Sequence, residues 1–105
     1  MTPIILRSEA LEVAVLPLGA SLVGVRFAGQ TRNMVLGFTD PADHARVPIY
    51  AGAVVGPLAS RVTDGLVRIN GNSHQMPLNE NGATTLHSGA EGLHARVWDL
   101  SLIHI

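Results

Sequence analysis

The stretch LVRINGNSHQM, residues 66–76, is the part of the chain that decides the fold class. Two strand-like runs flank Asn70-Gly71, and both of these residues tolerate the positive φ angles of a type I′ turn. Asn-Gly between two such runs is the strongest short-range signal for an antiparallel β-hairpin. We therefore predict a hairpin that ends before Pro77, because proline cannot donate a hydrogen bond to a strand ladder.

Other short apolar runs extend this pattern over the rest of the chain. Strands are expected at residues 11–16, 21–27, 33–38 and 93–105. Gly24 is a candidate β-bulge, and Trp98 is expected to anchor the core. Many short strands separated by Gly and Pro predict an all-β chain, arranged as an antiparallel β-sandwich.

One short helical turn interrupts the strands. In residues 39–45, Thr39 or Asp40 can cap the turn and Pro41 suits its first position. No long helix is expected anywhere in the sequence.

The length and composition set limits on the class of protein. The 105 residues allow at most one ordinary domain, with 47% apolar and only 14% charged residues. About 25% charged residues is usual, so we expect part of the apolar surface to meet a partner or a missing part of the same chain.

The charge pattern excludes several partners. The net charge is −1, lysine is absent and the seven arginines are scattered, which argues against nucleic acid. The lack of cysteine excludes disulfides. The N-terminal residues do not resemble a secretory signal, and no run approaches the roughly 18 apolar residues of a membrane span. A cytoplasmic protein without membrane partners is therefore expected.

Histidine offers the clearest candidate chemistry, because its unperturbed pKa of about 6.5 lies near working pH. His87 stands in the Gly-flanked loop TTLHSG, residues 84–89. Surface positions are expected for His44 and His94, a solvent-facing strand position for His74, and a frayed terminus for His104. No two histidines have metal-ligand spacing with a nearby carboxylate, so no metal site is predicted.

Two interpretations of His87 and Arg61 stay open on the residues alone. His87 is either a loop histidine whose ring satisfies neighbouring backbone groups or an acid/base group. Arg61 is either a surface ion-pair partner, with Asp64 as the candidate acid, or a rigid donor fork for ligand oxygens.

The order of several motifs resembles the N-terminal part of the aldose 1-epimerases, the galactose mutarotase family. The matching blocks are LGASL (18–22), NMVLGF (33–38), DPAD (40–43), YAGAVVG (50–56), SRV (60–62), the hairpin at 65–78, TLHSG (85–89), Gly92 and RVW (96–98). Each block is weak alone, but the ordered series spans nearly the whole chain.

The resemblance implies a galactose mutarotase-like β-sandwich and an enzyme that interconverts the α and β anomers of a galactose- or glucose-type hexose. A base deprotonates the anomeric hydroxyl while an acid protonates the ring oxygen, so the ring opens and recloses. No cofactor is implied, and the partner is the sugar itself. By resemblance, His87 is catalytic and contacts the sugar near its ring oxygen, while Arg61 and Ser60 bind substrate.

Departures from the family pattern accompany the matches. Ser60 stands where the family usually has Asn, and Ser88 replaces a Gly. The family's second histidine, its sugar-binding aspartate and its catalytic glutamate lie further along, so residues 1–105 are expected to form a single partial domain, the N-terminal third of the fold. Residues 100–105 fit the family poorly and are expected to be a non-native tail of a truncated reading frame.

These departures lead to further expectations. The chain alone is expected to be inactive and to self-associate through exposed strand edges and apolar faces. The alternatives are a non-catalytic carbohydrate-binding β-module and a relative acting on hexose 6-phosphates.

Overall fold

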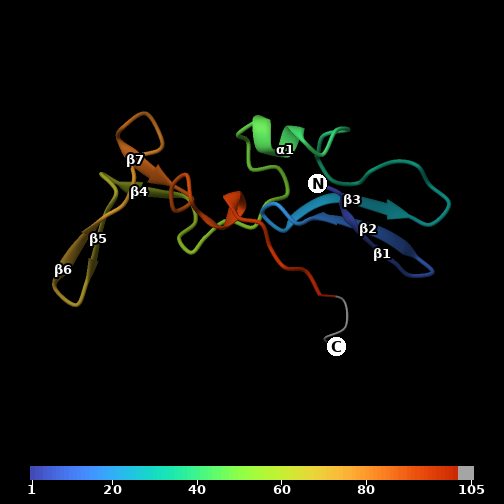
Figure 1. Cartoon of the computed structure of the whole chain (residues 1–105), viewed down its shortest axis with the longest axis horizontal. Helices are drawn as coiled ribbons and strands as arrows, with labels where there is room; N and C mark the ends of the chain where they lie inside the picture. The colour runs from blue at the N-terminus through green and yellow to red at the C-terminus, as the bar shows by residue number, and fades with distance from the viewer. Residues whose placement is uncertain (102–105) are drawn as a thin grey trace.

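The computed structural model of the protein describes residues 1–101 and consists of antiparallel β-strands with very little helix (Figure 1). The first sheet has the order β1-β2-β3, formed by Ile4–Arg7, Leu11–Leu16 and Ser21–Phe27. A second sheet pairs β4 (Arg61–Thr63) with β7 (Thr84–Leu86), and a third pairs β5 (Leu66–Ile69) with β6 (Asn72–Gln75). The expected all-β class is therefore present in the described residues.

The β5–β6 hairpin confirms the prediction from the Asn-Gly dipeptide. Asn70 and Gly71 have φ angles of 51° and 81°, as a type I′ turn requires. The register pairs Ile69 with Asn72 and Leu66 with Gln75, so β6 ends one residue earlier than expected.

The buried apolar side chains of the described residues lie in the first sheet. Its strands β2 and β3 have the expected bounds, and β1 is a further strand that was not predicted. Ala14 and Leu16 are buried on β2, Leu16 at 1% exposure. The register shifts between Ala14, which pairs with Gly24, and Val15, which pairs with Leu22, so an irregularity lies beside Gly24 as expected.

The predictions of two strands are wrong. Residues 33–38 form no strand because the Asn33 side chain takes over the edge of β3: its amide oxygen accepts from Val25 N–H at 3.0 Å and its amide nitrogen donates to Val23 O at 3.0 Å. Residues 93–101 also form no strand, since Leu93–Ala95 is a 3₁₀-helix, η1. The remainder of that predicted strand, with His104 and most of the predicted tail, lies outside the described residues.

The expected helical turn is present as α1, Asp43–Arg46. Its N-cap residue is Ala42, without a side-chain capping bond. Asp40 Oδ1 instead accepts from the Ala42 N–H at 2.9 Å, which anchors the entry to the turn.

The molecule is extended, and its sheets lie along its long axis (Figure 1). The radius of gyration is 16.5 Å, against about 13 Å for a compact domain of this length. Large apolar side chains remain exposed on the first sheet, on the β5–β6 hairpin and in the loops between them, including Leu36 at 80% and Ile69 at 55%. Among residues 1–101, no helix is long and apolar enough to cross a membrane.

Candidate functional site

His87 lies directly after β7, where the chain turns sharply. His87, Ser88 and Gly89 have φ angles of 49°, 69° and 88°, so three consecutive residues are left-handed. That conformation costs a non-glycine residue roughly 1–2 kcal/mol. Such strain persists only where the surroundings hold the chain, and it is common at functional sites.

Hydrogen bonds to the segment before β4 hold this turn. The backbone N–H of His87 donates to Ser60 O at 2.9 Å. The Ser88 hydroxyl donates to Leu58 O at 2.9 Å and accepts from Leu58 N–H at 2.7 Å. Ser60 itself has a φ of 63°. The two predicted site segments, 27 residues apart, are thus joined side by side.

The imidazole of His87 takes part in this network. Its Nδ1 accepts a hydrogen bond from the Ser60 backbone N–H at 2.9 Å. A ring nitrogen that accepts carries no proton, so the neutral ring has its proton on Nε2. His87 does satisfy a backbone group, as one interpretation held, and its half-buried ring keeps Nε2–H as a donor without a partner among the described residues.

Arg61, the first residue of β4, forms an ion pair with Glu80 rather than with Asp64. Its Nε donates to Glu80 Oε1 at 2.5 Å and its Nη2 to Glu80 Oε2 at 2.8 Å. Asp64 lies in the left-handed turn after β4, whereas Glu80 bridges to Thr84, which pairs with Thr63 on the neighbouring strand. The Asp64 expectation is therefore wrong.

The carboxylate of Glu80 is stabilised in its charged form. Hydrogen bonds from Arg61, and then from Thr84, lower the pKa of Glu80; the charge of Arg61, and that of His87 when its ring is protonated, act in the same direction. The same ion pair raises the pKa of Arg61. Glu80 is therefore the acidic group on which both Arg61 and His87 act, and no sequence motif marks it.

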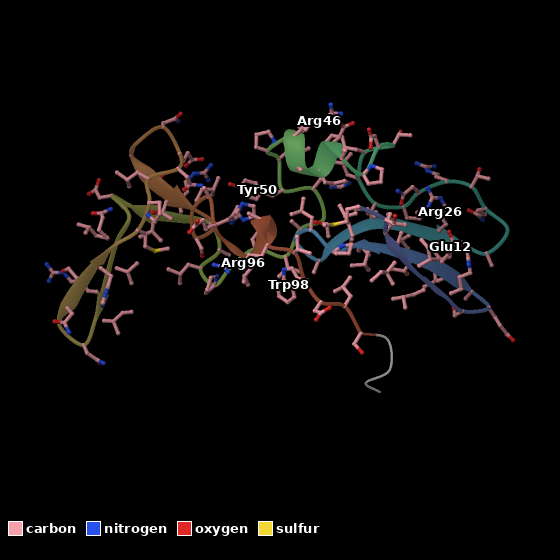
Figure 2. All side chains as sticks on the ribbon, viewed as in Figure 1. Glu12, Arg26, Arg46, Tyr50, Arg96 and Trp98 are labelled. Carbon is pink, nitrogen blue, oxygen red and sulfur yellow. The ribbon has the colours of Figure 1, made fainter. Side chains whose placement is uncertain are left out.

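Tyr50, labelled near the middle of the molecule in Figure 2, contacts both His87 and a second histidine, His94. Its ring lies edge-on to His87, with centroids 4.6 Å apart, and to His94, with centroids 4.7 Å apart. Tyr50 opens the motif YAGAVVG, residues 50–56, which by itself indicates no role for the ring. No periodicity signals such a contact, because the residues lie far apart in the sequence.

The surface positions expected for His44 and His94 are wrong. Both are half-buried, and His44 Nε2 and His94 Nδ1 are buried without a hydrogen-bond partner among the described residues. Burial lowers the pKa of His94, and the positive charge of a protonated His87 acts in the same direction. His44 packs edge-on against Phe38, with ring centroids 5.0 Å apart. His74 is exposed on β6, as expected.

A cavity of about 450 Å³ adjoins this cluster, and its lining includes Tyr50, His44, His94 and Asn79. Asn79 also holds the end of β7, since its side chain bonds both the N–H and the carbonyl of Leu86. In the part of the chain that the structure describes, no group of three or more His, Asp or Glu could hold a metal ion.

Comparison with known proteins identifies relatives over nearly the whole chain. The family model described as aldose 1-epimerase matches residues 3–104. An aldose 1-epimerase of Lactobacillus helveticus is 36% identical over 93 residues, 89% of this chain and 69% of that protein. A galactose mutarotase of Sus scrofa is 29% identical over 96 residues, 89% of this chain and 28% of that protein.

Solved structures show the same relationship in three dimensions. A galactose 1-epimerase from Lactobacillus acidophilus superposes with a TM-score of 0.78 at 34% identity, covering 92% of this chain and 28% of that one. An aldose epimerase homologue from C. elegans superposes with a TM-score of 0.82 at 29% identity, covering 92% of this chain and 31% of that one. The expected mutarotase-like fold class is confirmed, and the chain spans less than a third of these structures' length.

Proposed function

Because the chain belongs to the aldose 1-epimerase family, we propose that it forms part of an enzyme that interconverts the α and β anomers of a galactose- or glucose-type hexose. One group of such an enzyme removes the proton of the anomeric hydroxyl while another protonates the ring oxygen. The ring opens, the C1–C2 bond rotates, and the ring recloses on either face. Residues 1–105 supply the N-terminal portion of the sugar site in a partial domain.

The Ser60–His87 hydrogen bond is the observation that carries this proposal. Because Nδ1 accepts from the Ser60 N–H, the ring is held in one orientation with Nε2–H as its donor. A donor of this kind suits the ring oxygen of a pyranose, which can only accept. His87 therefore polarises the ring oxygen, and Arg61 and Ser60 bind hydroxyl groups nearby.

We also propose that the 105-residue chain does not accelerate the reaction by itself. Anomer exchange needs two proton-transfer groups, and the acids and bases near His87 are poorly suited to supply the second. Glu80 is a weak base because Arg61 and Thr84 lower its pKa. Burial lowers the pKa of His94, which makes its ring a weaker base.

Polarimetry of freshly dissolved α-galactose, with an equal concentration of imidazole as control, measures this directly. We expect a rate no faster than with imidazole. A faster rate would contradict the proposed inactivity of the chain while supporting the family reaction.

Sugar binding is tested by a chemical-shift titration with galactose. We expect saturable shifts of the Arg61 and His87 resonances and none at His74, which is exposed on β6 and serves as the control. The absence of saturable shifts would contradict the proposed sugar site.

The second candidate is a non-catalytic sugar-binding module. It is favoured by the commitment of Glu80 to Arg61, which leaves a binding surface without a free base. Sugar binding without turnover, even when the chain is combined with the remaining part of a family enzyme, would support this alternative.

A cytoplasmic location stays a prediction that cell fractionation tests.

A further inference from the structure

Arg61 is held in one orientation by a partner that is itself fixed. Glu80 contacts both Nε and Nη2 of the guanidinium, at 2.5 Å and 2.8 Å. Glu80 Oε1 also accepts from the Thr84 hydroxyl at 2.8 Å. The backbones of Glu80 and Thr84 exchange hydrogen bonds at 3.2 Å and 3.3 Å. Since Thr84 lies in β7, beside the β4 strand that carries Arg61, both ends of the ion pair rest on one strand pair.

The geometry leaves a defined set of donors on Arg61. A guanidinium has five N–H groups, one on Nε and two on each terminal nitrogen. Glu80 engages Nε–H and one N–H of Nη2, so two N–H groups of Nη1 and one of Nη2 remain. No hydrogen bond within residues 1–101 uses Nη1, and the side chain is 60% exposed. The outer edge of the fork therefore faces solvent as a parallel pair of donors.

The charge of the site follows from the same contact. The positive charge of Arg61 is balanced by the carboxylate of Glu80, which also lies within electrostatic reach of His87. An approaching phosphate or carboxylate meets a neutral pair rather than an unpaired cation, and it is repelled by Glu80. A neutral hydroxyl pair meets the same N–H donors without this penalty.

We propose that Glu80 is a positioning and specificity residue, which presents the outer N–H pair of Arg61 to two neighbouring hydroxyls and makes the site prefer a neutral hexose to an anionic one. The proposal rests on the proposed sugar site and assigns to Glu80 the discrimination between the hexose and hexose 6-phosphate alternatives.

The positioning role is tested without any ligand. The Nε–H resonance of Arg61 is recorded by ¹H–¹⁵N NMR in the wild-type chain, in Glu80→Gln and in Glu80→Asp. We expect slow solvent exchange of this proton in the wild type, faster exchange in Glu80→Gln, and partial recovery in Glu80→Asp, which keeps the carboxylate. Glu9→Gln is the matched control, because it removes one negative charge from an exposed position far along the chain.

The specificity role is tested by titrating the same four proteins with galactose and with galactose 6-phosphate. We expect Glu80→Gln to shift the ratio of the two dissociation constants toward the phosphate by about tenfold. Glu9→Gln should leave that ratio unchanged. If the ratio depended only on the net charge of the protein, Glu9→Gln would shift it as much as Glu80→Gln does. An unchanged ratio and unchanged Nε–H exchange in Glu80→Gln would overturn the role of Glu80 alone. Failure of the wild type to bind galactose would overturn the proposed sugar site and this specificity together.

Discussion

Ser60 and His87 exchange two hydrogen bonds: the Ser60 backbone N–H donates to His87 Nδ1 at 2.9 Å, and the His87 backbone N–H donates to Ser60 O at 2.9 Å. Both residues have left-handed backbones, with φ angles of 63° and 49°. The pair therefore combines local strain with a closed hydrogen-bonded ring, the arrangement expected of a preorganised binding group.

Replacement of His87 tests the strength of this link. His87→Ala removes the acceptor of the Ser60 N–H and leaves alanine in a left-handed conformation, so we expect a loss of about 1 kcal/mol in the free energy of unfolding. His87→Asn should lose less, because asparagine tolerates this conformation and keeps an acceptor. Urea denaturation measures both, with the exposed His74→Ala as the control. Equal midpoints for His87→Ala and His74→Ala would contradict the expectation.

Ser60→Asn should make the site more like that of the family. Asparagine is enriched at positive φ, so this change should stabilise the fold by less than about 1 kcal/mol. Its amide also adds donors and an acceptor, and we expect tighter galactose binding in the chemical-shift titration. Ser60→Val, which is β-branched, should be destabilising at the same φ. A lower urea midpoint for Ser60→Asn than for the wild type would refute this account.

Because of the Arg61–Glu80 ion pair, we expect part of the free energy of unfolding to be lost at acid pH. Arg61 and Thr84 lower the pKa of folded Glu80 below its unfolded value of 4.5. The contribution is therefore fully present above about pH 4.5 and is lost as the pH falls through the folded pKa. Unfolding free energies of the wild type and Glu80→Gln should converge on acidification below that pH. If the difference in unfolding free energy between the wild type and Glu80→Gln stays constant down to acid pH, the ion pair is not the source of the pH dependence.

Two glycines with positive φ provide a matched pair. A Cβ at Gly65 would lie 2.7 Å from Thr85 Oγ1 and 2.8 Å from Met76 O, whereas a Cβ at Gly71 meets nothing within 4 Å. We expect Gly71→Ala to cost about 1 kcal/mol for the backbone alone. Gly65→Ala should cost a further 1–3 kcal/mol or so because atoms must move. Thermal or urea unfolding of the two variants compares them, and equal losses would disprove the packing argument.

Self-association is expected from the sparse core. Among the described residues, Ala14 and Leu16 are the buried apolar side chains, while Leu66 and Ile69 on β5 are exposed at 51% and 55%. Leu66 and Ile69 are three positions apart on β5, so each face of this two-stranded sheet carries an exposed apolar side chain, and such exposed side chains and strand edges promote association. Sedimentation velocity should show concentration-dependent oligomers that Leu66→Thr with Ile69→Thr reduces. A monomer with a sharp, concentration-independent melt above about 60 °C would contradict this prediction.

Local signals predicted the elements that depend on neighbouring residues. The β5–β6 hairpin follows from Asn70-Gly71, and β2 and β3 follow from apolar runs that end at Pro or Gly. The short strands β4 and β7 were missed, because three-residue runs carry no clear periodicity and gain their stability from each other. Residues 33–38 look like a strand, but the Asn33 side chain occupies the edge bonds that a strand would need.

The candidate site likewise combines residues that the sequence predicted with partners that it did not. His87, Arg61 and Ser60 were singled out from residue type and motif order. Their partners were not, since Arg61 pairs with Glu80, 19 residues away, and Tyr50 contacts both His87 and His94.

Residue identities and turn chemistry alone thus specify the β class, the hairpin and the motif series of the aldose 1-epimerase family. These properties depend on interactions within a few residues, which a sequence displays directly. The tautomer of His87 and the neutralisation of Arg61 by Glu80 arise only when β4 and β7 pair. The partial burial of His94 arises only when the folded chain brings Tyr50 against its ring. Hydrogen bonds, charges and burial act over a few ångströms in space, and chain folding determines which distant residues come within that range.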